Sequence, residues 1–336
     1  MTPLAQALQV SLLSNCNDGS SVYRCELDRS WTVGAVPQGG YSLGIIVEAC
    51  IKHQVGSSRH VDPIHISAHF LRATNVGGGE VRVKALKTGK TFSNILAELA
   101  QQGNTKIIAH LIFGDLSPLQ NSQVRKVLEP PSPYARRLPL HSHPSELSFD
   151  ATKQYWARNM GVQMSTDISL LTHNDPDNPL RTTSKTVGGG GIQWGAWCEL
   201  THKNDEIRTS SLPFFCDTFM NLPNLLPDGE AGSSGRQGSW FPTITMIVEF
   251  KARIPSCDDY SHRTFGLYSE SRFLTEPYGR HNARVEVWTA PSQIGQGEVT
   301  EGWRDKQYCI AVADQMALML PMELNIREGN RDSAKL

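Results

Sequence analysis

The stretch Leu212–Pro227 reads LPFFCDTFMNLPNLLP and holds one charged residue, Asp217, among aromatic and aliphatic side chains. Its apolar residues predict a buried helix that begins near Leu212. An ionised carboxylate is rarely buried unless a partner compensates its charge. Asp217 therefore either accepts backbone N–H groups at a helix start or serves chemistry, and this stretch alone leaves both interpretations open.

Around this stretch, the second half of the chain shows one helix among strands. A glycine run at 188–191 precedes the first predicted strand, and the helix 212–226 follows it. The β-branched and aromatic runs bounded by turn residues then predict further strands. The predicted strands of this half cover residues 192–201, 243–252, 264–273, 283–289 and 308–319.

The first half repeats this order. A short strand is predicted at 22–27, and Gly39 and Gly40 open a helix with an apolar stripe that ends near Gly56. Four strands separated by glycine-containing turns follow this helix. They cover residues 64–73, 80–86, 92–100 and 107–113.

The repeated order predicts an α+β protein with a double hotdog fold, in which each of two tandem domains wraps a curved antiparallel sheet around one long helix. We place the N-terminal hotdog domain at 1–116, a Pro-rich linker at 117–150 and the C-terminal hotdog domain at 151–322. Residues 323–336 are predicted to form a flexible C-terminal tail. The first 15 residues predict an amphipathic helix.

Composition argues against several classes of protein. The formal net charge is -1 and no basic stripe is present, so we expect no nucleic-acid partner. No apolar run approaches the roughly 18 residues of a membrane span. The seven cysteines are widely spaced and form no CxxC pair, which predicts neither a disulfide framework nor a zinc ribbon. His65 and His69 could share a strand face, but no third ligand is visible, so we predict no metal site.

Short motifs on the predicted elements carry a family likeness. In the first half they are Gly39–Gly40, Phe70–Arg72 (FLR), and Gly89 with Phe92 and Ser93. In the second half they are Asp217 followed by Leu222 and Pro223, Thr243 in a Pro-Thr-Ile step, and Gln315 in the last strand. In this order they resemble the TesB-type acyl-CoA thioesterases, most of all the divergent thioesterase-like members found in fungi. The likeness covers roughly residues 20–115 and 190–320.

The resemblance implies an enzyme that hydrolyses an acyl thioester, with acyl-CoA as the expected substrate and no metal or redox cofactor. It implies that Asp217 orients and deprotonates a water that Thr243 and Gln315 also hold. The unpaired N–H groups at the start of the first predicted helix suggest Gly40 and Tyr41 as the oxyanion and substrate-binding residues. We also expect self-association through the sheets into a homodimer or a larger homo-oligomer.

Some features depart from the family pattern: the polar insertion 291–305, the glycine run and Trp31. They leave two alternatives open. The protein could release, cyclise or isomerise a polyketide-type intermediate on the same scaffold, or it could bind acyl groups without turnover. The chain ends in Ala334-Lys335-Leu336, which is similar to the SKL-type peroxisomal address. We therefore predict a peroxisomal location, or a cytoplasmic one if the tripeptide is not read.

Overall fold

The computed structural model describes residues 1–55, 58–117, 127–149, 160–183, 185–227, 230 and 238–330. In the first half, one long helix packs against antiparallel strands, as predicted. The elements of this half are α1 (Leu4–Ala7), β1 (Val10–Asn15), β2 (Ser20–Leu27), η1 (Arg29–Trp31), β3 (Thr32–Val33), β4 (Val36–Pro37), α2 (Gly39–Val55), β5 (Asp62–Phe70), β6 (Gly77–Thr88), β7 (Ser93–Gln101) and β8 (Asn104–Gly114).

The second half repeats the strands but has a much shorter central helix. Its elements are η2 (Pro144–Glu146), β9 (Val162–Thr166), α4 (Ile168–His173), β10 (Ile192–Leu200), η3 (Thr209–Ser211), α5 (Leu212–Cys216), α6 (Leu222–Leu225), β11 (Ser239–Trp240), β12 (Thr243–Phe250), β13 (Thr264–Ser271), β14 (Leu274–Thr275), β15 (Arg280–Trp288), η5 (Trp303–Lys306), β16 (Cys309–Ala317), β17 (Leu320–Pro321) and α7 (Met322–Gly329).

The single helix predicted at 212–226 was wrong. Helix α5 ends at Cys216 with Asp217 as its C-cap, and the separate short helix α6 begins at Leu222. The Thr218 hydroxyl donates to the Phe214 carbonyl and satisfies the last turn of α5 locally. Pro223 has no N–H for the carbonyl four residues before it, so a continuous helix could not cross this position without losing a hydrogen bond.

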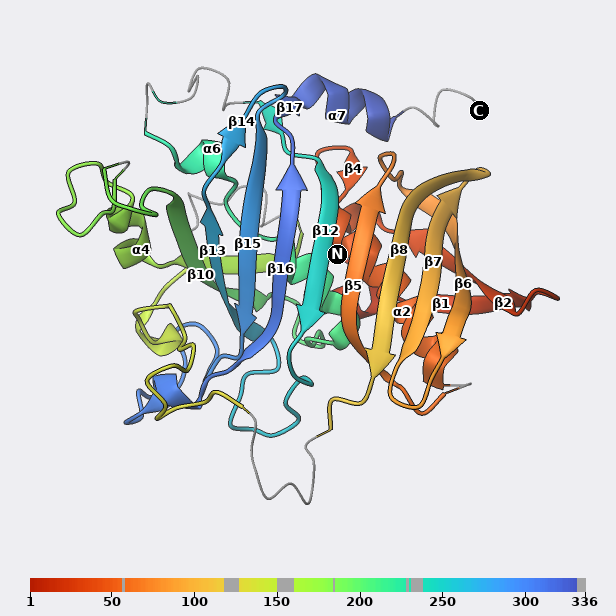
Figure 1. Cartoon of the computed structure of the whole chain (residues 1–336), viewed down its shortest axis with the longest axis horizontal. Helices are drawn as coiled ribbons and strands as arrows, with labels where there is room; N and C mark the ends of the chain where they lie inside the picture. Colours follow the sequence, from red (N-terminus) through yellow and green to blue (C-terminus); the bar gives the residue numbers. More distant parts are fainter. Residues whose placement is uncertain are drawn as a thin grey trace.

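The two halves share one sheet. Within the described residues, thirteen strands run in the order β1-β2-β6-β7-β8-β5-β12-β16-β15-β13-β10-β9, with β14 beside β15. The halves join where β5 pairs with β12 in antiparallel register, for example Ser67 opposite Ile247. Figure 1 shows the first-half strands on one side of this junction and the second-half strands on the other. The arrangement is a double hotdog, as the repeated order predicted.

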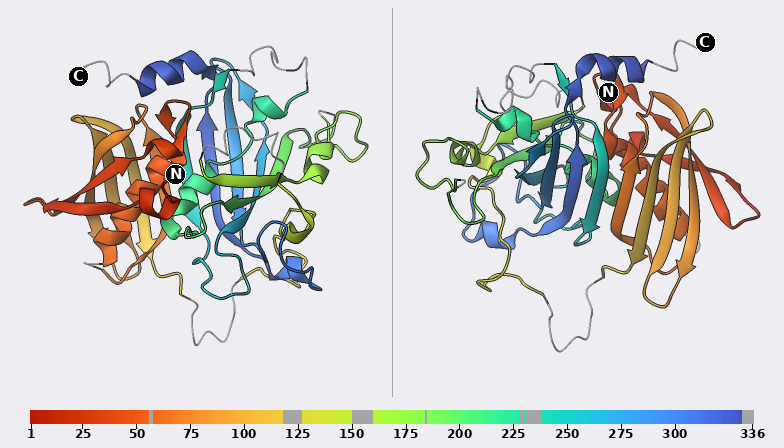
Figure 2. Two further views of the ribbon diagram at one scale, coloured as in Figure 1. Left: turned by 180° about the vertical axis from the view of Figure 1, so that it is seen from behind. Right: turned by 45° about the horizontal axis from the view of Figure 1, so that its top comes forward.

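The helices α2 and α5 pack against each other on one face of this sheet, in front of it in the left view of Figure 2. Two glycines on α2 make the close approach possible. A Cβ atom at Gly40 would lie 2.1 Å from the Pro213 carbonyl oxygen, and one at Gly44 would lie 2.5 Å from the Ser210 carbonyl oxygen. Side chains from both halves form one continuous core cluster around this contact.

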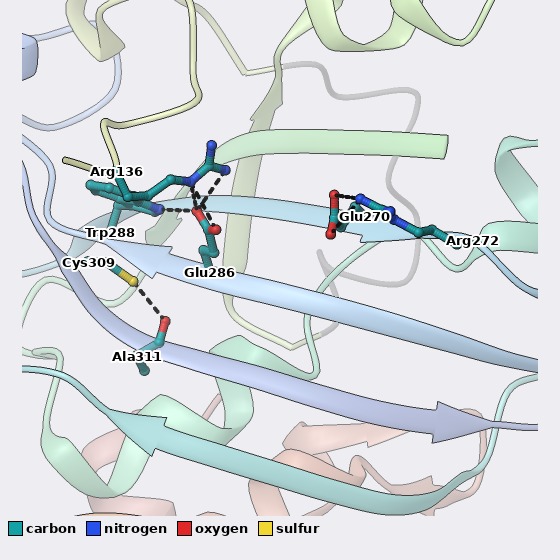
Figure 3. A network of polar contacts seen from close by, with 7 residues as sticks. All are labelled: Arg136, Glu270, Arg272, Glu286, Trp288, Cys309 and Ala311. Atoms are coloured by element: carbon teal, nitrogen blue, oxygen red, sulfur yellow. Dashed lines mark hydrogen bonds and ion pairs between the residues drawn. The ribbon is translucent and has the colours of Figure 1, made fainter. Parts of the chain in front are cut away.

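Part of the predicted linker 117–150 packs against the second half. The Arg136 guanidinium binds the buried Glu286 carboxylate on β15 through three contacts of 3.1–3.2 Å, and the same carboxylate accepts from Trp288 Nε1 at 3.0 Å (Figure 3). Leu140 is buried in a second apolar cluster with Trp288. These residues therefore do more than connect the two domains.

Both ends of the chain correct the sequence-based prediction. The predicted N-terminal helix was wrong beyond Ala7, because Val10–Asn15 pairs with β2 as strand β1. The predicted flexible tail, 323–336, was wrong for residues 323–329, which belong to helix α7 (Met322–Gly329). The tripeptide at 334–336 lies outside the described residues. Among the helices of the described residues, none is long and apolar enough to span a membrane.

Candidate active site

Asp217 lies where the two halves meet. It is the C-cap of α5, and its side chain contacts the N-terminus of α2. Its Oδ2 atom accepts a hydrogen bond from the Gly40 N–H at 2.8 Å. Gly40 is the second residue of α2, so its N–H is one of the amides that a helix leaves unpaired at its N-terminus. Asp217 thus does cap a helix, but one in the other half of the molecule, through Gly40, which lies 177 residues earlier in the chain. The favourable field of the α2 N-terminus helps to hold its negative charge.

Thr243 and Gln315 converge on the same carboxylate. The Thr243 hydroxyl lies 3.2 Å from Asp217 Oδ1 and 3.1 Å from Gln315 Oε1, so its single proton can bond either oxygen. The structure therefore brings together the three residues that we predicted to act on one water. Asp217 and Thr243 line a cavity, whereas Gln315 is buried behind them.

A β-bulge places Thr243 on the correct face of its strand. Thr245 pairs with Met316, whereas Thr243 pairs with Ala317, so β12 carries one extra residue between the two pairs. Because opposite residues of an antiparallel pair share a face, Thr243 lies on the same face as Ala317 and Gln315. In regular alternation Thr243 would point to the other face. Bulges are known to re-aim side chains beside active sites.

The cavity has a volume of about 410 Å³ and lies between the two halves. This volume falls within the roughly 300–1,000 Å³ that is typical of ligand pockets. Both halves supply its walls, and most lining side chains are apolar. Among the described lining residues, Arg72 carries the only positive charge and Asp217 the only carboxylate. Within the described part of the chain, no group of three or more His, Cys, Asp or Glu side chains could hold a metal ion.

Burial raises the pKa of Asp217 to about 6. The hydrogen bonds from Gly40, Thr243 and Gln315 oppose this shift because they favour the charged form. The carboxylate is therefore ionised at neutral pH, yet it is a much stronger base than an ordinary aspartate. A pKa in this range suits a residue that accepts a proton from water.

We expect activity to depend on pH through this carboxylate. Below a pH of about 6 the protonated Asp217 cannot accept a proton, so kcat/KM should fall about tenfold per pH unit. Stability should show the opposite trend, because the folded state holds this proton up to a higher pH than the unfolded state does. The Asp217 contribution thus lowers the free energy of unfolding as pH rises from about 4 to about 6. Rate profiles and thermal melts across this range test both signs.

The structure does not bring Tyr41 to the cavity. Its ring is fully buried, its hydroxyl donates to the Ala7 carbonyl at 3.1 Å, and its N–H donates to Gln38 Oε1 at 2.6 Å. The predicted oxyanion role of Tyr41 therefore has no geometric support, because other residues of the first half bond both its hydroxyl and its N–H. The Gly40 N–H is likewise engaged by Asp217. Gly39 does line the cavity, and its N–H has no hydrogen-bond partner within the described residues.

Gln38 is a residue of the site that the sequence-based prediction missed. It is buried, lines the cavity and precedes α2. Its Nε2 donates to the carbonyl oxygens of Asp217 at 2.9 Å and Phe214 at 3.3 Å. Its Oε1 caps α2 by accepting from the Tyr41 N–H. One side chain thus ties the end of α5 to the start of α2, and the only signal in the sequence was its place just before the glycine pair.

We predict that Gln38→Glu disturbs the base. One carboxylate oxygen can still accept from Tyr41, but the other would face the carbonyls of Phe214 and Asp217 and add a negative charge beside the site. The acidic limb of the pH–rate profile should move up by about one unit. Gln54→Glu, at the far end of α2, controls for introducing a buried carboxylate into the same helix. An unshifted profile would leave Gln38 with a structural role only.

Comparison with known proteins assigns the chain to a family. A family profile described as "Acyl-CoA thioesterase N-terminal domain" matches residues 27–114. The "Ustilagic acid biosynthesis cluster protein orf2" of Mycosarcoma maydis is 30% identical over 267 residues, which span 71% of this chain and 69% of that protein. The chain belongs to the TesB-type acyl-CoA thioesterase family. As a member of this thioesterase family, it is a hydrolase.

Two further proteins extend the comparison. The "Thioesterase-like protein TwmA" of Talaromyces wortmannii is 23% identical over 273 residues, covering 70% of this thioesterase-family chain and 76% of that protein. The crystal structure of the acyl-CoA thioesterase II TesB2 from Mycobacterium marinum superposes with a TM-score of 0.59 at 12% identity, covering 95% of this chain and 98% of that one. The second likeness establishes the fold shared with the family.

Proposed function

We propose that this protein hydrolyses acyl-CoA to a free acid and CoA, using a water activated by Asp217. The observation that carries the proposal is the contact between Asp217 and Thr243 on the wall of an apolar cavity, with Gln315 behind them. A carboxylate with a raised pKa beside a hydroxyl can orient one water and take its proton. The apolar walls would accept the acyl group.

In this mechanism the water oxygen attacks the thioester carbonyl while its proton passes to Asp217. The Gly39 N–H at the start of α2 is the oxyanion donor that we propose, because it lines the cavity and is unpaired within the described residues. The tetrahedral intermediate then expels the thiolate, which receives the proton held by Asp217. One water is consumed, and one acid and one thiol are formed.

The test is release of free thiol from a series of acyl-CoA esters by the purified protein, read with a thiol reagent. The proposal is supported if, for at least one acyl-CoA, the protein releases thiol faster than buffer without protein does. Acyl-CoA binding without thiol release would favour the non-catalytic acyl-binding alternative. Thioesters of pantetheine, assayed beside the CoA esters, show whether the nucleotide part of CoA contributes to recognition.

A second candidate is a step in a biosynthetic pathway on the same scaffold. The name of the Mycosarcoma maydis relative places that protein in a biosynthesis cluster, which favours this candidate. A base such as Asp217 can also remove a proton from carbon, and cyclisation or isomerisation would then change the acyl group without releasing thiol. Mass spectrometry of the acyl product, run beside the thiol assay, separates these reactions from hydrolysis.

A further inference from the structure

The C-terminal segment crosses from the second half of the molecule to the first and closes the cavity. After β16, the short strand β17 pairs with β11, and α7 then runs across to the turn between β3 and β4. The right view of Figure 2 shows α7 lying over both halves. Leu318, Leu320 and Met322 of this segment line the cavity. This stretch, Leu318–Gly329, is called the roof segment below.

A fully buried asparagine holds the roof segment on the first half. Asn325 Nδ2 donates to the Val33 carbonyl at 2.9 Å, and Asn325 Oδ1 accepts from the Ala35 N–H at 2.8 Å. Both groups belong to the β3–β4 turn, so the amide substitutes for a short stretch of paired backbone. Because Asn325 is completely buried, loss of these bonds would leave turn groups without partners, which is costly.

The contact is too close for ordinary side chains on either surface. A Cβ atom at Gly34 would lie 2.4 Å from Asn325 Oδ1 and 3.3 Å from Met322 Sδ. A Cβ atom at Gly329 would lie 2.5 Å from the Cβ atom of Ala35. Both the turn and the helix therefore carry a glycine where they meet, because a side chain there would prevent the close approach of the two backbones.

A second asparagine, Asn75, fixes the C-terminal end of α7. Its Nδ2 donates to the Glu328 carbonyl at 2.9 Å and to the Gly329 carbonyl at 3.2 Å, and so satisfies the last carbonyls of the helix. Gln101 holds the Asn75 backbone on both sides, through bonds of 2.9 Å and 2.8 Å. The docking site for α7 is thus built from rigid groups of the first half.

The cavity beneath the roof segment suits an acyl group better than a phosphate. Apolar side chains line the cavity on the elements around the roof, including Val33, Val36, Trp240, Leu318, Leu320 and Met322, and others such as Phe70 and Ile107 line its remaining wall. Arg72, the only cation among the described lining residues, is exposed at the end of β5. The phosphates of a CoA thioester would therefore lie toward Arg72 and solvent, and the apolar acyl group toward the roof.

We infer that the roof segment is the wall that limits the acyl group of the substrate, with Met322 as the side chain that meets the acyl end and Asn325 as the latch that holds the wall. This inference rests on the proposed thioester hydrolysis. Helix α7 is a single eight-residue helix, and a helix of that length is marginal without tertiary support. Its position, and so the size of the cavity, depends on the latch rather than on the helix itself.

The experiment compares kcat/KM of the full-length protein for straight-chain acyl-CoA esters from butanoyl to palmitoyl. Met322→Trp should reduce kcat/KM for the longest ester that the wild type accepts by at least about tenfold, while the shortest ester changes by less than about twofold. Met322→Ala should extend the range toward longer chains. Asn325→Ala should broaden the range in the same direction as Met322→Ala. Glu323→Gln, on the exposed side of α7, is the matched control and should leave the profile unchanged.

Equal changes for all chain lengths in the Met322 variants, or an unchanged profile in both Met322→Trp and Met322→Ala, would overturn the inference. Melting curves separate a loosened wall from an unfolded protein, and Met322→Ala remains informative if the tryptophan variant does not fold. If wild type cleaves no acyl-CoA, the proposed function fails on its own. Binding of S-alkyl-CoA thioethers of increasing chain length, measured by calorimetry in the same variants, would then test the wall without turnover.

Discussion

Asp217→Asn should abolish most thioester hydrolysis while the protein stays folded. The asparagine oxygen can still accept from the Gly40 N–H, and its amide N–H can donate to the Thr243 hydroxyl, whose own proton then bonds Gln315 Oε1. The amide cannot take a proton from water. Loss of a general base of this kind reduces kcat by about 10²–10⁴. Because burial opposes the charge of Asp217, its neutral replacement should also be at least as stable as wild type at pH above about 6. Steady-state kinetics and thermal melts measure both effects.

Asp314→Asn is the matched control for this substitution. Asp314 lies next to Gln315 on β16 but points to the outer face, where its half-exposed carboxylate pairs with Arg284 at 3.0 Å. Loss of an exposed pair costs about 0–1 kcal/mol, and hydrolysis should not change. Full activity in Asp217→Asn would show that the mechanism is wrong even though the family is right.

Gly40→Ala should cause a large loss of stability. The new methyl group would lie 2.1 Å from the Pro213 carbonyl oxygen and 2.7 Å from the Asp217 Cβ atom, and neither can move without separating α5 from α2. Overpacking of this kind costs about 1–3 kcal/mol, and the contact with rigid backbone suggests the upper end of that range. Activity should also fall, because the same displacement pulls Asp217 away from the Gly40 N–H. Denaturant unfolding measures the stability loss.

A glycine with room around it provides the comparison. Gly78 on β6 has an ordinary backbone conformation, and a Cβ atom there would meet nothing closer than 3.6 Å, the distance to Glu26 Oε2. Gly78→Ala should therefore be neutral or slightly stabilising, since alanine reduces the freedom of the unfolded chain. If both glycine variants unfold at the same denaturant concentration as wild type, the close packing of α2 and α5 does not contribute as described.

Some of the site could be predicted from local pattern alone. The runs around Thr243 and Gln315 are rich in apolar residues and are bounded by turn residues, so both residues were placed on the correct elements. The glycine pair before Tyr41 marked the start of α2 because a helix start needs free amides and little steric bulk. The resemblance added the roles of Asp217, Thr243 and Gln315, which spacing could not have supplied.

Other features depended on contacts between distant parts of the chain. The bulge that turns Thr243 inward arises from pairing with β16, and hydrophobic alternation cannot reveal a one-residue shift of register. Gln38 has no recognisable motif, and its importance appears only when α5 comes to lie beside α2. Helix α7 is too polar to predict by burial, since its latch is an amide bonded to a turn about 290 residues away. The predicted homo-oligomer stays a prediction.

Asp217 shows where the two sources of information divide. The sequence around Asp217 places one acid within an apolar run. It determined that the carboxylate must have a partner, because burying an isolated charge costs too much free energy. Local sequence could not choose between a helix cap and a base. The tertiary structure gave Asp217 both kinds of contact at once. The Gly40 N–H at the N-terminus of α2 donates to one carboxylate oxygen, and the Thr243 hydroxyl donates to the other. Only folding brings these groups together, because the partners lie 177 residues before and 26 residues after Asp217 in the chain.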